Sequence, residues 1–230
     1  MKNRKNINNV IFLICSVVAC AFAMCFVDGV IKPQYFIKSL IKLLLFLIVP
    51  CVYFLINKSE KVKFFELFKI KKRNLIISLM LGIFVYFIIL FGYFLLRTSF
   101  DFSIIAGKLT ENAGVSASNF LCVALYISFV NSFLEEIFFR GFGFIILKNN
   151  ANRYFAYVFS ALLFALYHTG MMIGYYDIGI LLLTVSGLLV AGIMFNFINE
   201  KSENIYSSWL VHMFANFGIN TVGFILFDML

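Results

Sequence analysis

Residues 10–26 read VIFLICSVVACAFAMCF, and this run decides the class of fold. It is continuously apolar rather than alternating, and comparable apolar blocks follow it along the chain. A helix of about 20 apolar residues spans the ~30 Å hydrocarbon layer of a bilayer. Because backbone polar groups in lipid need partners within the protein, only helices or a closed barrel can span it. Unbroken runs favour helices, so the sequence predicts an all-α, polytopic transmembrane bundle.

The composition supports a membrane protein and argues against other classes. The chain has 230 residues, of which 63% are hydrophobic and 13% are charged, whereas a soluble domain carries about 25% charged residues. Its net charge is +8, but positive charge beside membrane spans sets their orientation. We therefore expect the lipid bilayer, and no nucleic acid, as a partner. The five cysteines form no CxxC pair, which argues against a disulfide framework or a cysteine-based metal site.

The apolar blocks predict about seven or eight helices. The predicted spans are residues 10–27, 39–56, 74–96, 118–147, 153–170, 178–198 and 206–230. The last span is predicted to break near Gly218, which would give the eighth helix. We divide the chain into an N-terminal unit of three spans, residues 1–117, and a C-terminal catalytic core of four spans, residues 118–230. The polar segment 57–73 is either a cytoplasmic loop or a helix on the membrane surface.

The lysines and arginines predict the orientation. With the N-terminus inside, fourteen of them, including Arg140, fall on inside segments and five, including Lys42, on outside segments. Inside segments of membrane proteins are enriched in these residues. The sequence thus predicts a multi-pass protein of the cell membrane with a cytoplasmic N-terminus.

Several polar side chains lie within the C-terminal spans. The six of interest are Glu135, Glu136, Arg140, His168, His212 and Asn216. An ionisable residue costs at least ~2.5 kcal/mol at the centre of a membrane helix, so such residues indicate function by default. The residue spacing on either side of the 148–153 turn places Glu135 and His168 at nearly equal depth, with His212 one or two helical turns shallower.

Helical geometry predicts different roles for the two glutamates. Glu136 and Arg140 are four residues apart and share a face, so they can form an ion pair. Glu135 points about 100° away and has no cation on its own helix. It is the predicted general base or acid. His212 and Asn216 are also four residues apart, and one face of the last span presents both.

This set of side chains supports amide hydrolysis by either of two routes. Glu135, His168 and His212 could bind Zn²⁺ with an activated water. Alternatively, without a metal, Glu135 and His168 activate the water while His212 and Asn216 stabilise the oxyanion. The residues alone leave both routes open.

Three short motifs resemble those of one family. EEIFFR (135–140) resembles EExxxR, FALYH (164–168) resembles FxxxH, and HMFAN (212–216) resembles HxxxN. In this order, on separate spans, they resemble the CPBP family of CAAX proteases and bacteriocin-processing enzymes, also called Abi. The resemblance covers about residues 118–218.

The resemblance implies an intramembrane endopeptidase whose site opens to the cytosol and which acts on a peptide or a membrane protein. It implies that Glu135 and His168 activate the water and that His212 and Asn216 bind the oxyanion, with metal dependence open. Bacterial members are linked to bacteriocin maturation, self-immunity and peptide-signal processing. The alternatives are a non-catalytic immunity or scaffold protein of the same family and a proton-coupled transporter. No internal repeat of the transporter kind is evident, and the sequence predicts no particular oligomeric state.

Overall fold

The computed structural model describes residues 2–173 and 178–230, and within these residues it contains helices and no strand. The helices are α1 (Lys2–Phe26), η1 (Val27–Ile31), α2 (Tyr35–Ile56), α3 (Lys58–Glu66), α4 (Lys72–Leu96), α5 (Ser103–Ala113), α6 (Ala117–Leu125), η2 (Tyr126–Asn131), α7 (Ser132–Glu135), η3 (Glu136–Ile146), α8 (Leu147–Asn150), α9 (Arg153–Met172), α10 (Ile178–Ser202) and α11 (Ile205–Leu226). Here α denotes α-helix and η denotes π-helix. The predicted all-α class is confirmed.

Six helices of the described chain are long and apolar enough to cross a membrane. These are residues 7–31, 35–56, 72–96, 117–150, 178–202 and 205–226. The 20-residue helix α9 packs among them. The predicted polytopic bundle is therefore confirmed, and the protein is a multi-pass membrane protein.

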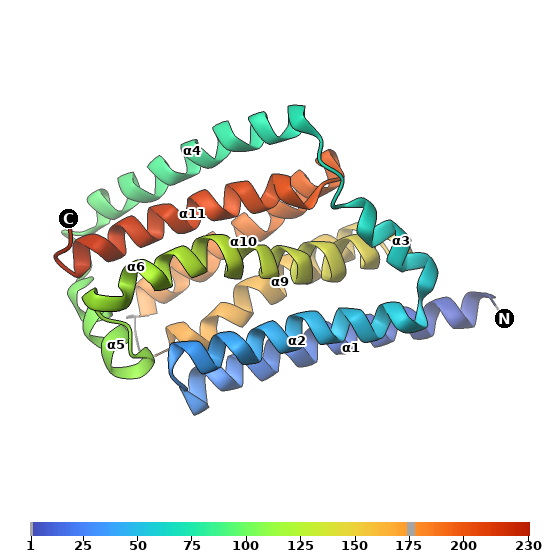
Figure 1. The fold of residues 1–230 in the computed structure, drawn as a ribbon, viewed down its shortest axis with the longest axis horizontal. Helices are drawn as coiled ribbons and strands as arrows, with labels where there is room; N and C mark the ends of the chain where they lie inside the picture. Colours follow the sequence, from blue (N-terminus) through green and yellow to red (C-terminus); the bar gives the residue numbers. More distant parts are fainter. Residues whose placement is uncertain (1, 174–177) are drawn as a thin grey trace.

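The helices run roughly parallel to one long axis of the bundle (Figure 1). Helix α4 forms one outer edge beside α11, and α1 and α2 form the opposite edge, with the α6–α8 stretch and α9 between them. The two ends of the chain lie at opposite ends of the bundle. Residues of the N-terminal unit thus cover the C-terminal helices from both edges.

Small residues allow α4 to approach α11 closely. A Cβ atom at Gly82 would lie 3.0 Å from the Phe214 ring, and one at Gly218 would lie 3.1 Å from Ile89. Glycine at helix contacts permits this approach in membranes, where packing rather than the hydrophobic effect holds helices together. The predicted break near Gly218 is wrong, because α11 continues to Leu226. The glycine serves close packing instead.

The segment 57–73 forms the short helix α3 and a loop that packs against the bundle. Phe64 and Leu67 are buried, and the backbone N–H of Ile205 donates to the Leu67 carbonyl at 2.9 Å. The Asn204 side chain donates to the Lys69 carbonyl. This connection therefore holds the turn between α10 and α11 in place, which fixes the start of the helix that carries His212.

An aromatic layer joins α2 to the centre of the bundle. The Phe46 ring stacks on Phe138 with centroids 4.0 Å apart, and it meets Phe139 edge-on at 5.6 Å. All three side chains are fully buried. Aromatic pairs of this kind contribute about 0.5–1.5 kcal/mol beyond their burial. The packing sets the position of α2 one turn below Lys42.

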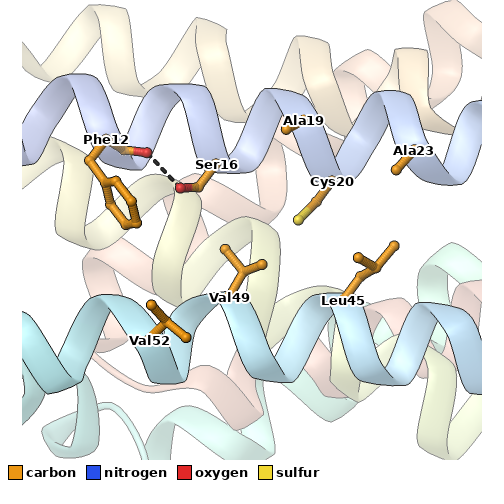
Figure 2. A pocket seen from close by; sticks show the side chains of 8 residues that line it. All are labelled: Phe12, Ser16, Ala19, Cys20, Ala23, Leu45, Val49 and Val52. Atoms are coloured by element: carbon orange, nitrogen blue, oxygen red, sulfur yellow. Dashed lines mark hydrogen bonds between the residues drawn. The ribbon is translucent and has the colours of Figure 1, made fainter.

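A cavity of about 390 Å³ lies between α1 and α2, and Figure 2 shows its walls. Its lining residues are Phe12, Ser16, Ala19, Cys20, Ala23, Leu45, Val49 and Val52. None of them is charged, and the Ser16 hydroxyl donates to the Phe12 carbonyl. The cavity is therefore an apolar space and offers no group that could activate water.

Candidate active site

Glu135 lies at the end of α7 and is 1% exposed. Its Oε1 atom accepts hydrogen bonds from Lys42 Nζ at 2.8 Å, Asn131 Nδ2 at 3.0 Å and Tyr167 Oη at 3.1 Å. Its Oε2 atom accepts no hydrogen bond among the described residues. The two oxygens of one carboxylate thus differ: one is anchored and the other is available.

Both histidines of the chain face the available oxygen. The distance from Glu135 Oε2 to His168 Nε2 is 3.8 Å, and that to His212 Nε2 is 3.7 Å. These gaps exceed a direct hydrogen bond, and a water molecule between polar groups at such separations can bridge them. The similar depth predicted for Glu135 and His168 agrees with this geometry, whereas His212 is not offset from them as predicted.

The His168 ring is held by the backbone of its own helix. Its Nδ1 atom lies 2.7 Å from the carbonyl oxygen of Phe164. Because a carbonyl only accepts, Nδ1 carries the hydrogen, and the Nε2 lone pair of the neutral ring points toward Glu135. The Phe164 ring also meets the imidazole edge-on, with centroids 4.7 Å apart. Phe164 contributes a carbonyl one turn before the imidazole.

Glu136 and Arg140 pair as their spacing predicts, with Arg140 Nε 3.5 Å from Glu136 Oε1. Both side chains are fully buried. The Arg140 guanidinium also lies over the Phe164 ring at 3.9 Å and faces the Phe195 ring at 5.0 Å from the centroids. Aromatic faces attract such a cation most strongly where water is excluded. The cation is thus held by a carboxylate and two rings.

The predicted division between a structural Glu136 and an unpaired Glu135 is wrong. Lys42 from α2 supplies the cation that Glu135 lacks on its own helix. Glu136 Oε1 also lies 2.9 Å from His212 Nδ1, so it binds an imidazole as well as Arg140. A carboxylate beside Nδ1 fixes the ring orientation and leaves Nε2 facing the site. Each glutamate is therefore paired with a cation, and each faces an imidazole.

Asn216 lies one turn after His212 on α11, as predicted. Among the described residues, it forms no hydrogen bond with Glu135. Its amide nitrogen donates to the Ile127 carbonyl at 3.2 Å. Asn220, one turn further on, donates to the Ala124 carbonyl and to Ser128 Oγ. These bonds join α11 to the helix that carries the glutamates. Asn216 keeps a second amide hydrogen for another acceptor.

The helix that carries the glutamates is largely π-helical. Residues 126–131 and 136–146 have this wider winding on either side of α7. π-helical turns are rare, and they occur frequently at functional sites. The sequence predicts this span over residues 118–147, but it does not predict that the helix is π-helical. Asn131 lies four residues before Glu135, and its Nδ2 atom donates to Glu135 Oε1 at 3.0 Å.

Lys42, Asn131 and Tyr167 are the site residues that the sequence analysis missed. Lys42 was counted as an outside charge, whereas it is 5% exposed within α2. Arg140, which falls on an inside segment, is fully buried as well. When Lys42 and Arg140 are both left out of the count, the excess of inside over outside positive residues is unchanged. The signal for Lys42 was present: a lysine within an apolar span is as costly as a glutamate there.

The proposed zinc ligands Glu135, His168 and His212 come together, but their surroundings do not favour a dication. Within the described residues, no group of three His, Cys, Asp or Glu side chains is placed to hold a metal ion. The Lys42 ammonium at 2.8 Å already neutralises Glu135, and it would repel Zn²⁺. The donors present therefore fit a metal poorly, and we derive no step through one.

Comparison with known proteins found one match, in the C-terminal part of the chain. Residues 117–218 match the model of the family described as type II CAAX prenyl endopeptidase Rce1-like. No curated protein and no solved structure matches the chain. The matched residues include all three motifs and begin within one residue of the predicted core boundary. Residues 117–218 are thus similar to the Rce1-like type II CAAX prenyl endopeptidase family, which is consistent with the CPBP resemblance of the motifs.

Proposed function

We propose that the protein hydrolyses a peptide bond within the membrane by a water that Glu135 and His168 activate. The observation that carries this proposal is the free Oε2 atom of Glu135, which lies 3.8 Å and 3.7 Å from the two imidazole Nε2 atoms. The family match supports a protease in general. The residue roles are our inference from this geometry.

The reaction follows from the atoms present. A water molecule between Oε2 and His168 Nε2 loses a proton to one of these acceptors as its oxygen attacks the peptide carbonyl. The same proton passes to the leaving amine when the C–N bond breaks. Asn216 and, when its Nε2 bears a proton, His212 donate to the oxyanion that forms. Glu136 holds His212 in the orientation that this role requires.

The family description and the burial of the site suggest the substrate class. We infer a peptide or membrane-protein segment that reaches the site from within the bilayer, because Glu135 is 1% exposed. His168 and Asn216 are each 9% exposed, and both are more exposed than Glu135 and His212. The excess of positive charge near the N-terminus and in segment 57–73 favours a cytoplasmic N-terminus.

The test uses the purified chain in proteoliposomes with an internally quenched, farnesylated CAAX-type peptide as the probe. Glu135→Gln keeps the shape of the side chain and removes its base, so we expect kcat to fall at least ~100-fold. Glu203→Gln makes the same change at an exposed position away from the site, and we expect wild-type cleavage. Equal cleavage by wild type and Glu135→Gln would reject the proposed mechanism, and no cleavage by wild type would favour the non-catalytic alternative.

A further inference from the structure

Lys42 is a buried cation that enters the site from outside the family-matched domain. It lies on α2, and its side chain is 6% exposed. Its ammonium donates to Glu135 Oε1 at 2.8 Å and to Asn131 Oδ1 at 2.5 Å, and it lies 4.9 Å from the Tyr167 ring centroid. Each of its three N–H bonds therefore has an acceptor: a carboxylate, an amide oxygen and an aromatic face.

The partners of Lys42 also bind the same carboxylate oxygen. Asn131 and Tyr167 donate to Glu135 Oε1 at 3.0 Å and 3.1 Å. Lys42, in turn, binds Asn131 through the amide oxygen, which turns the amide hydrogens toward Glu135. Three donors on Oε1 hold the carboxylate plane, and Oε2 is left toward His168 and His212. The cluster therefore decides which oxygen meets the substrate water.

Burial of the Lys42 ammonium within the bundle is energetically unfavourable, and a lysine that only linked α1 to α2 would not need to be buried there. Transfer of a charged lysine to the centre of a membrane helix is unfavourable even on the lenient insertion scale. One turn earlier, Lys38 forms an ion pair with Asp28 at 3.0 Å at the end of the α1–α2 hairpin, with 17% of its side chain exposed. The hairpin already has that ionic link, so Lys42 is not required to close it.

We propose that Lys42, together with Asn131 and Tyr167, positions Glu135 for hydrolysis by anchoring one carboxylate oxygen and presenting the other to the two imidazoles. This inference rests on the proposed function. It assigns part of the active site to the N-terminal unit, because α2 precedes the matched residues 117–218. Lys42 acts through Glu135 and does not touch the reacting atoms.

A kinetic comparison tests the positioning role with the same farnesylated probe peptide in proteoliposomes. Lys42→Met keeps the apolar stem and removes the ammonium, so we expect kcat to fall about 100-fold with KM within twofold, because a displacement of about 1 Å has that effect on rate. Lys42→Arg restores the charge, and we expect about tenfold higher kcat than in Lys42→Met. Lys38→Met breaks the neighbouring ion pair and is expected to keep wild-type kcat. A Lys42→Met enzyme with wild-type kcat, or one that loses no more kcat than Lys38→Met, would overturn the proposal.

A stability cycle tests the Lys42–Glu135 pairing without any cleavage assay. Removing one partner of a buried pair leaves an uncompensated charge, so Lys42→Met and Glu135→Gln should each lower the melting temperature by about 10 °C. The double variant loses both charges and is expected to recover at least half of that loss. Additive losses in the double variant would refute the pairing even if Glu135 is catalytic. Strong coupling together with unchanged cleavage by Glu135→Gln would instead refute the proposed function and leave the pairing intact.

Discussion

Glu136 allows a quantitative test of the buried charge network. Glu136→Gln removes one negative charge between Arg140 Nε at 3.5 Å and His212 Nδ1 at 2.9 Å. At an effective dielectric constant of about 20, two unit charges separated by 3.5 Å attract by roughly 5 kcal/mol. Arg140 is fully buried, so its charge cannot regain water after the substitution. We expect Glu136→Gln to lose about 3–5 kcal/mol of unfolding free energy.

The double variant Glu136→Gln/Arg140→Met separates stability from catalysis. It removes both charges, and the methionine fills the space between Phe164 and Phe195 that the arginine stem occupies. Removing both charges of a buried pair avoids the uncompensated charge that a single substitution leaves. We therefore expect the free energy of unfolding of the double variant to lie within about 1 kcal/mol of the wild-type value. Its kcat should stay low, because His212 still lacks its carboxylate.

The assay is reversible unfolding of the purified protein in mixed micelles, followed by circular dichroism, with cleavage of the same probe peptide measured in parallel. A Glu136→Gln variant whose free energy of unfolding lies within about 1 kcal/mol of the wild-type value would contradict the Glu136–Arg140 pairing, since a buried unpaired guanidinium costs more than that. A double variant with wild-type kcat would show that the carboxylate beside His212 Nδ1 has no part in the reaction.

Two further predictions concern helix packing and metals. Gly170→Ala would place a Cβ atom 2.6 Å from the Cys25 carbonyl oxygen. We therefore expect the free energy of unfolding to fall by roughly 1–3 kcal/mol and kcat to fall because His168 is displaced. Gly187→Ala, where the added Cβ meets nothing within 4 Å, is the control and should leave the melting temperature and kcat unchanged or slightly raised. Treatment with 1,10-phenanthroline is expected to leave cleavage unchanged, and loss of cleavage that added Zn²⁺ restores would contradict the metal-free mechanism.

The parts of the fold that follow from local spacing were predictable, and those that depend on contacts between distant segments were not. Apolar length predicted the six candidate membrane spans, and the seventh predicted span, residues 153–170, corresponds to helix α9, which is not among those candidates. Four-residue spacing predicted the Glu136–Arg140 pair. The Lys42–Glu135 pair joins residues far apart in the chain, and no periodicity connects them. A single rule would have helped: two buried carboxylates require two buried cations, and Lys42 is a second cation within an apolar span.

The charges of the site account for why His168 can accept a proton. Glu135 and Glu136 carry two negative charges, and Lys42 and Arg140 carry two positive charges in contact with them. The sum is zero with both histidines neutral, so neither ring needs a proton to balance a carboxylate. A neutral His168 with its Nδ1 hydrogen directed to a carbonyl has an accepting Nε2. The Lys42 cation from α2 balances the Glu135 carboxylate without a proton on His168, and the Nε2 atom of that ring can accept the proton of the attacking water.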